Sequence, residues 1–260
     1  MPGVSLLFAL QIGSLLGFSL TIFKLFRESL FRRYLFFSLF LIIRIVYVVA
    51  GMPLARTSKA YFFYWLFGHP VYWVFYVLVV RELCGLILDK YTGLKTLGRW
   101  FMYGSVAIAL AMSLLSMITG VNPNIGARSS RGAMGYVLSI DKGVTISLAV
   151  FLLVLLALLS RYPVRLQRNV VLHSFVFTSF FLSDGLTKLW VTMFGVETFR
   201  VANLVLTTLT AACGFSWFWW LSRKGEEVTT HVANMDSRNE ERLMSQLNYL
   251  NQTLIKSGKS

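Results

Sequence analysis

Long apolar runs separated by short polar segments are the dominant pattern of this chain. A helix that crosses a bilayer needs about 20 mostly apolar residues, because the hydrocarbon core is about 30 Å thick and each helical residue rises about 1.5 Å. Strands are excluded as spans, since the runs show no alternation of apolar and polar positions. The sequence therefore predicts seven transmembrane helices, over residues 4–23, 34–51, 61–86, 101–120, 144–160, 170–194 and 199–221.

The composition supports an all-α polytopic membrane protein, folded as a seven-helix bundle. Hydrophobic residues make up 56% of the chain and charged residues only 14%, whereas soluble domains carry about 25% charged residues. A soluble protein of this length could not bury so much apolar surface in one core. The formal net charge of +14 does not indicate nucleic acid, because the basic residues form short clusters between apolar runs. We expect the lipid bilayer as the partner of this surface, and no nucleic acid.

Basic residues at the ends of the runs predict the orientation. About twelve Lys and Arg fall on one side, within 24–33, 90–99, 161–168 and 223–224, and about six fall on the other. Cytoplasmic loops carry the excess of basic residues, so the N-terminus is expected outside and the C-terminus in the cytoplasm. The first residues, Met1-Pro2-Gly3-Val4, lack the basic region of a signal peptide, and we expect the first run to remain as a span.

The longest predicted loop covers residues 121–143 on the outer side. This segment is rich in Gly and Ser and begins Val121-Asn122-Pro123-Asn124. Loops of this length are often functional or mobile. An inverted-repeat transporter usually carries paired spans broken by Gly or Pro, but Pro70 in the third run has no counterpart in the later runs.

The chain is expected to divide into a bundle, 1–222, and a cytoplasmic tail, 223–260. Ser237 and Glu240 form a capping box, which predicts an amphipathic helix over about 238–256. One face of this helix carries Leu243, Leu247, Leu250 and Leu254. The leucine face could lie on the membrane or the bundle, form a homo-oligomer, or dock another protein, and two heptads do not decide among these.

A few ionisable side chains fall inside the predicted spans. Arg44 and Asp184 lie near the middle of their runs, where an isolated charge costs about 2.5–3.5 kcal/mol on insertion scales. We predict an ion pair between them, acting as a structural tie or as part of a gate or binding site. Lys188 follows Asp184 by one turn, and His69 precedes Pro70 at mid-depth. The candidate intramembrane polar site is therefore Arg44, His69, Asp184 and Lys188.

Other residues are predicted to serve helix packing. Gly13 and Gly17 form a G-x-x-x-G pattern in the first run, which permits close approach of another helix. Arg81 and Glu82 are expected to pair locally or with the following basic loop, and His173 lies near the inner end of the sixth run.

No motif identifies a reaction, a cofactor or a metal. Cys84 and Cys213 lie inside apolar runs, where small buried residues are expected. The three histidines lack the converging spacing of a metal site. The chain contains no G-x-S-x-G elbow, Walker loop or paired catalytic carboxylates. These absences argue against enzymatic activity and leave an intramembrane enzyme with few polar residues as an open alternative, and we expect neither cofactor nor metal.

Two resemblances can be stated on particular residues. The step from Asp184 to Lys188 resembles microbial rhodopsins, where a retinal-bearing lysine follows a carboxylate by one turn. However, Tyr64 stands where that family would place its counterion and the lysine is not in the last run, so we expect no retinal. Three stretches, 81–100, 160–171 and 241–254, resemble a group of uncharacterised bacterial seven-span membrane proteins. That resemblance implies only a location in the bacterial cytoplasmic membrane.

These patterns lead to two functional hypotheses. The first is a non-enzymatic receptor-like or scaffold protein, which would use the loop 121–143 and the leucine face of the tail as contact surfaces. The alternative is a carrier or channel for a small solute, with a polar site at the bilayer midplane around the four intramembrane residues.

Overall fold

The computed structural model is almost entirely helical. It describes residues 2–54, 59–89, 92–118, 130–161, 165–195, 198–227 and 229–231, and in the tail 245–246, 248–249 and 251–253. The long helices of this part of the chain are α1 (Pro2–Arg27), α2 (Leu35–Gly51), α3 (Lys59–Ile87), α4 (Thr92–Ile118), α5 (Ser130–Arg161), α6 (Arg168–Phe194) and α7 (Phe199–Trp220). Three short elements complete it: β1 (Arg165–Gln167), α8 (Lys224–Glu227) and β2 (Thr229–His231).

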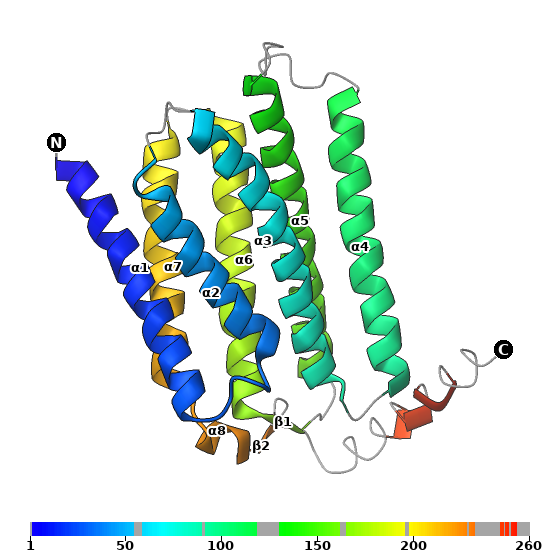
Figure 1. Cartoon of the computed structure of the whole chain (residues 1–260). Helices are drawn as coiled ribbons and strands as arrows, with labels where there is room; N and C mark the ends of the chain where they lie inside the picture. Colours follow the sequence, from blue (N-terminus) through cyan, green and yellow to red (C-terminus); the bar gives the residue numbers. More distant parts are fainter. Residues whose placement is uncertain are drawn as a thin grey trace.

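The long helices run alternately up and down in one bundle (Figure 1). Helix α1 packs along α7, α7 along α6, α6 along α5, and α5 along α4, while α2 and α3 pack together across α1 and α5. The short elements lie at one end of the bundle, here called the α8 end. The N-terminus lies toward the opposite end (Figure 1). Six of the helices surround the middle of the bundle, whereas α4 stands at its edge.

Five of the described helical segments are long and apolar enough to cross a membrane. They are Leu6–Arg27, Lys59–Ile87, Val137–Ala157, Arg168–Phe194 and Phe199–Trp220. Helix α2 is also apolar but has 17 residues, which gives a length of about 25 Å. Large apolar side chains are exposed on the outside of the bundle, among them Phe23, Trp100, Met193 and Trp219. This outer surface fits lipid rather than water.

Helix α5 corrects the prediction of a long loop. The loop was expected to cover 121–143, but the helix begins at Ser130, and residues 119–129 lie outside the described part. The apolar positions Val137, Ile140 and Val144 continue the helical spacing of the span backwards past Asp141. One aspartate and one lysine interrupted the apolar run, and the prediction ended the helix at them.

Glycine allows α1 and α7 to approach closely. A Cβ atom built on Gly17 would lie 3.3 Å from the backbone of Gly214, and one on Gly214 would lie 3.2 Å from the Phe18 ring. The Thr21 hydroxyl donates to the carbonyl oxygens of Gly17, at 2.8 Å, and Gly214, at 3.1 Å. Gly13 has no atom within 4 Å of such a Cβ. Only the second glycine of the predicted pattern therefore serves this contact.

The start of α2 is capped by another helix. No side chain of its own N-cap residue bonds the first turn. Instead, the Glu82 carboxylate on α3 accepts hydrogen bonds from the backbone N–H groups of Phe36, at 3.1 Å, and Phe37, at 3.0 Å. An acceptor of negative charge suits the free N–H groups and the dipole of a helix start. The predicted pairing of Glu82 with basic side chains is therefore wrong among the described contacts.

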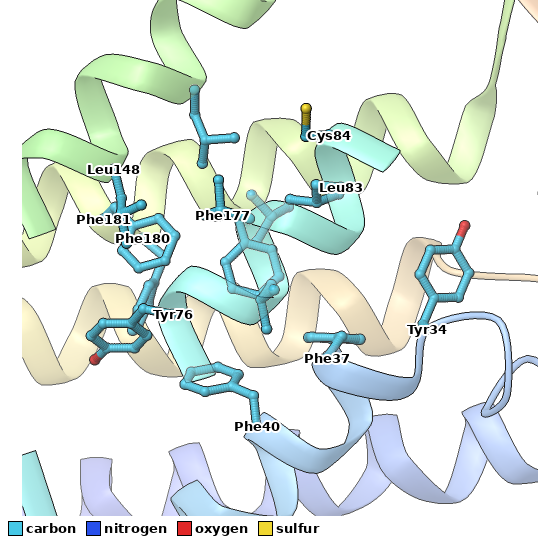
Figure 2. Close-up of a cluster of buried hydrophobic side chains, with 14 of the residues drawn as sticks. Tyr34, Phe37, Phe40, Tyr76, Leu83, Cys84, Leu148, Phe177, Phe180 and Phe181 are labelled. Carbon is cyan, nitrogen blue, oxygen red and sulfur yellow. The ribbon is translucent and has the colours of Figure 1, made fainter. Parts of the chain in front are cut away.

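Aromatic side chains gather in the interior of the bundle (Figure 2). Those near the start of α2, the start of α6 and the end of α7 lie toward the α8 end. Phe37 on α2 packs against Phe177 on α6, at 5.5 Å between ring centroids, and Trp217 on α7, at 4.9 Å. His173 is fully buried beside Phe37, 4.3 Å away, and Phe177, 4.9 Å away. We call this group the aromatic plug, comprising Tyr34, Phe37, His173, Phe177 and Trp217.

A polar cluster closes the α8 end below the aromatic plug. The Glu226 carboxylate of α8 accepts hydrogen bonds from Tyr34, at 2.6 Å, and Asn169, at 2.7 Å, and forms an ion pair with Arg33 at 2.9 Å. Asn169 also donates to the Ser222 carbonyl oxygen at 2.7 Å. We call these four side chains the Glu226 latch: Arg33, Tyr34, Asn169 and Glu226. It joins the α1–α2 turn, the start of α6 and the segment after α7.

Contacts with the bundle continue beyond the predicted boundary at residue 222. Strand β2 pairs antiparallel with β1, and α8 packs against α6. Further along, the Asn251 side chain accepts a hydrogen bond from the Gly93 N–H, at the start of α4, at 2.8 Å. The described tail residues, 245–246, 248–249 and 251–253, are helical. The predicted tail face of Leu243, Leu247, Leu250 and Leu254 lies outside the described residues.

Candidate functional site

A cavity of about 610 Å³ lies in the middle of the bundle and is lined by residues of six helices. On α3 its wall runs from Tyr61 to Tyr76, a length of about 22 Å at the helical rise. Tyr61 and Phe199 lie near the start of their helices, at the end opposite α8. Tyr76 and Arg44 lie near mid-helix. The cavity therefore extends from the middle of the bundle toward the end opposite α8.

Its wall combines aromatic, hydroxyl and charged side chains. The α3 positions Tyr61, Trp65, His69, Tyr72 and Tyr76 follow one another at steps of three and four residues, which places them on one face of the helix. The facing wall includes Thr187 and Val191 of α6 and a row of α7 side chains between Phe199 and Thr210. Sites for small molecules usually have this character, being mostly apolar with a few polar groups, and they measure about 300–1,000 Å³.

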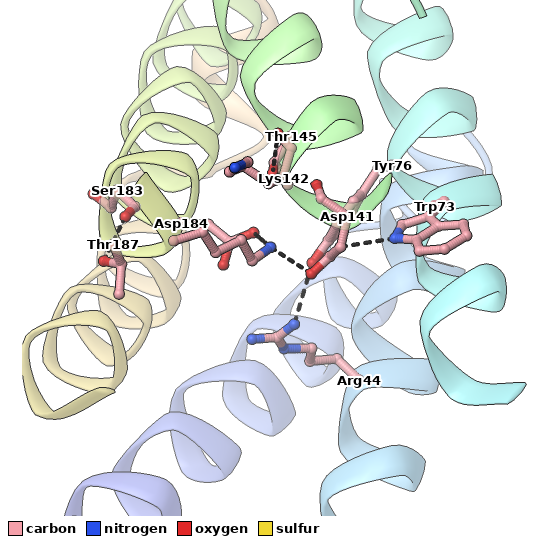
Figure 3. A network of polar contacts seen from close by, with 10 residues as sticks. Arg44, Trp73, Tyr76, Asp141, Lys142, Thr145, Ser183, Asp184 and Thr187 are labelled. Atoms are coloured by element: carbon pink, nitrogen blue, oxygen red, sulfur yellow. Dashed lines mark hydrogen bonds and ion pairs between the residues drawn. The ribbon is translucent and has the colours of Figure 1, made fainter. Parts of the chain in front are cut away.

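Two carboxylates from different helices share one lysine in this wall. Lys188 Nζ lies 2.5 Å from the Asp184 carboxylate, one turn away on α6, and 2.6 Å from that of Asp141 on α5. The three side chains are 13%, 9% and 8% exposed. The Trp73 indole N–H also donates to Asp141, at 2.7 Å, and Figure 3 shows these two side chains pointing toward each other. This triad carries a formal charge of −1.

Arg44 is the fourth ionisable group among the Asp, Lys and Arg side chains of the cavity wall. Its guanidinium donates to the Tyr76 hydroxyl at 3.4 Å and lies 5.2 Å from the Tyr72 ring and 5.6 Å from the Phe180 ring. No carboxylate among the described residues lies within 4.0 Å of it. A cation–π contact contributes about 0.5–2 kcal/mol and a hydrogen bond between a charged and a neutral group about 1.5–3 kcal/mol. The cation is held in place but not neutralised.

The predicted ion pair between Arg44 and Asp184 is therefore wrong. Lys188 sits at i+4 from Asp184 on the same helix, a spacing that brings opposite charges together. Asp141 then enters from α5 and binds the same ammonium group. Both carboxylates are occupied by Lys188, and the aromatic face formed by Tyr72 and Phe180 takes up Arg44.

His69 lines the same cavity and lies beside Trp65, with 4.2 Å between ring centroids and the two rings tilted by 46°. Its Nδ1 atom is buried without a hydrogen-bond partner in the described part of the chain, as are the hydroxyls of Tyr47 and Tyr72. All three residues belong to the cavity wall. Buried polar atoms are nearly always paired with protein or bound molecules. This wall can therefore offer further hydrogen bonds to a molecule that enters it.

The structure brings together all four residues of the predicted polar site. Arg44, His69, Asp184 and Lys188 line one cavity, although they come from three helices. Asp141 was missed because the prediction placed it in the loop 121–143. A usable signal was present, since apolar residues at 137, 138 and 140 precede it in a helical spacing. The aromatic wall could not be recognised, because tyrosine and tryptophan are common at membrane interfaces.

The described residues contain no group of three His, Cys, Asp or Glu side chains that could hold a metal ion. Cys84 and Cys213 are buried and free. Comparison with known proteins gives no match: neither a protein-family model, nor a curated protein, nor a solved structure resembles this chain. The cavity and its charges are thus the features from which a function can be argued.

Proposed function

We propose that this protein is a seven-span membrane carrier for a small polar solute that binds in the central cavity. The observation that carries the proposal is the cavity itself, which extends from the middle of the bundle among six helices and is lined by four ionisable Asp, Lys and Arg side chains. Charged groups inside a membrane are costly and typically mark the path of a substrate or ion. A scaffold role would not require such a cavity, whereas a solute carrier requires one.

Two further helices support the count of seven spans. Helices α2 and α4 lie beside candidate spans over the length of the bundle (Figure 1). Helix α2 also carries the chain from the α8 end, where α1 ends, to the opposite end, where α3 begins. With both helices spanning, the basic excess of about twelve against about six lies at the α8 end. The α8 end would face the bacterial cytoplasm, with the cavity extending toward the outside.

The two ends of the bundle differ in a way that suits alternating access. The cavity extends toward one end, whereas the aromatic plug and the Glu226 latch close the other. Transport would require the plug and the latch to separate while the outer part closes. The rival receptor or scaffold hypothesis depended on the leucine face, which lies outside the described residues, and on the predicted loop 121–143, of which residues 130–143 are helical.

Cysteine accessibility tests the proposal. After replacement of Cys84 and Cys213 by alanine, Thr210→Cys places a thiol in the cavity wall, and Thr178→Cys serves as the control. Both threonines are 5% exposed, but among the two only Thr210 lines the cavity. A membrane-impermeant thiol reagent would be added to right-side-out and to inside-out vesicles, and labelling followed with time.

A carrier predicts labelling of Thr210→Cys from both sides and of Thr178→Cys from neither. Labelling of Thr210→Cys from the outer side alone would instead indicate a ligand receptor with a fixed inner closure. Protection of Thr210→Cys on both sides would overturn the proposal, because no solute could then enter the cavity.

A further inference from the structure

We infer that the solute of this cavity is a small organic anion whose carboxylate binds Arg44. The inference rests on the proposed function, since it takes the cavity to be a solute site. It adds the chemical class of the solute and the residue that anchors it. Three features of the wall carry it: the pairing of its charges, the surroundings of Arg44, and the volume and lining of the cavity.

Among the charged side chains of the cavity wall, Arg44 is the one without an oppositely charged partner in the described part of the chain. Lys188 contacts both carboxylates of the cavity, at 2.5 and 2.6 Å. Neither Asp141 nor Asp184 is therefore free to bind a cationic solute without displacing the lysine. Arg44 has only a long hydrogen bond to Tyr76 and no described carboxylate within reach. An entering anion would pair with Arg44 and leave the triad intact.

The surroundings of Arg44 favour a carboxylate. The guanidinium is planar and its N–H groups match the two oxygens of a carboxylate. The rings of Tyr72 and Phe180, at 5.2 and 5.6 Å, hold the group in position. Tyr72 is 5% exposed, and its hydroxyl has no hydrogen-bond partner within 3.5 Å among the described residues. Tyr72 can therefore supply an additional donor to the same anion.

The volume and lining indicate an organic body on the anion. An inorganic ion would occupy a small fraction of about 610 Å³. Beyond Arg44 the wall presents aromatic and aliphatic side chains, including Trp65, Val191, Phe199 and Leu206. Such a wall gains free energy by burying apolar surface of the solute. The solute would therefore carry one carboxylate and an apolar or aromatic body.

Direct binding tests the inference on full-length protein in nanodiscs, by isothermal titration calorimetry. The probes are benzoate and hexanoate, with benzamide and hexanamide as matched neutral analogues, and chloride and phosphate as inorganic anions. We expect each carboxylate to bind at least tenfold more tightly than its amide. Arg44→Gln should abolish this preference, whereas Arg81→Gln, an exposed arginine of α3 outside the cavity wall, should leave it unchanged.

The stability of the variant separates a binding role from a structural one. If Arg44 serves the solute, Arg44→Gln without probe should unfold at about the same temperature as the unmodified protein, because loss of the Tyr76 hydrogen bond and the ring contacts is offset by removal of a buried charge that has no carboxylate partner. A lower unfolding temperature together with unchanged benzoate binding would make Arg44 a structural tie. Tyr72→Phe, which keeps the ring over the guanidinium, should weaken benzoate binding several-fold in a bundle of unchanged stability.

The outcomes also distinguish this inference from the proposed function. Equal binding of carboxylate and amide, absence of binding by both carboxylates, or competition by chloride at the same concentration would overturn the organic-anion inference. Each of these outcomes is compatible with the proposed carrier function as long as Thr210→Cys is labelled from both sides. If Thr210→Cys is not labelled from both sides, the carrier hypothesis is refuted, whichever molecule binds at Arg44.

Discussion

Asp141 on α5 and Lys188 on α6 lie 2.6 Å apart in the wall of the central cavity. Their contact ties α5 to α6 in the cavity wall and turns the local pair of Lys188 and Asp184 into a triad with two acidic members. Both carboxylates of the cavity contact Lys188 in this triad. Arg44 is therefore the one cation of the cavity wall that has no carboxylate in contact among the described residues.

Removal of Lys188 should lower the free energy of unfolding more than removal of either carboxylate. Lys188→Met leaves two buried carboxylates side by side and should cost about 3–5 kcal/mol. Asp141→Asn leaves Lys188 paired with Asp184 and should cost only about 1–3 kcal/mol. Thermal unfolding of the purified variants in one detergent measures the order. A larger loss for Asp141→Asn would show that the lysine does not hold the triad together.

The cap on α2 predicts a stability effect from a neighbouring helix. Glu82→Leu removes the acceptor of the Phe36 and Phe37 N–H groups and should cost about 1–2 kcal/mol. Arg81→Leu, at the preceding and exposed position of α3, should change the stability by less than about 0.5 kcal/mol. Denaturation midpoints compare the two. Equal effects would contradict a capping role.

The α1–α7 contact can be tested with two glycines of one helix. Gly17→Leu introduces a side chain where a Cβ already meets the Gly214 backbone at 3.3 Å, and overpacking of this kind costs about 1–3 kcal/mol. Gly13→Leu has open space and should be neutral or slightly stabilising. The unfolding temperatures should differ accordingly, and similar values for both variants would exclude a close crossing at Gly17.

The Tyr34–Glu226 hydrogen bond predicts a loss of stability at high pH. Burial, and next the Glu226 carboxylate, raise the pKa of Tyr34 above its ordinary value of 10.0. In the folded state the phenol therefore keeps its proton at a pH where the unfolded chain releases it. The stabilisation is complete below about pH 10 and declines as the pH rises from there toward the folded pKa. The stability advantage over Tyr34→Phe should accordingly shrink above pH 10 in unfolding measurements made from pH 8 to 11. A constant difference would show that Tyr34 does not titrate differently in the two states.

The Glu226 latch predicts how the α8 end opens. Glu226→Ala removes the acceptor of Tyr34 and Asn169 and the ion pair with Arg33. A loss of about 1 kcal/mol in the closed state shifts a two-state equilibrium about fivefold. Labelling of Thr210→Cys from the α8 side should become about fivefold faster, with Glu227→Ala, an exposed neighbour in α8, as the control. Unchanged labelling would exclude the latch as a gate.

Hydrophobic runs alone determined that this chain forms apolar helices, and within the described residues five of these are able to cross a membrane by length and composition. The same runs placed Arg44, His69, Asp184 and Lys188 within apolar helices. Because polar side chains at such positions avoid lipid, they were expected to face the interior of the bundle. The tertiary structure decided which of these charges meet. By depth alone Asp184 could pair with Arg44 or with Lys188, and the i+4 spacing on α6 favours Lys188. Only the packing of α5 against α6 brings Asp141 to the same lysine. Pairing depends on distances between helices, which follow from packing, whereas the apolar pattern reports only how far along its own helix each residue lies.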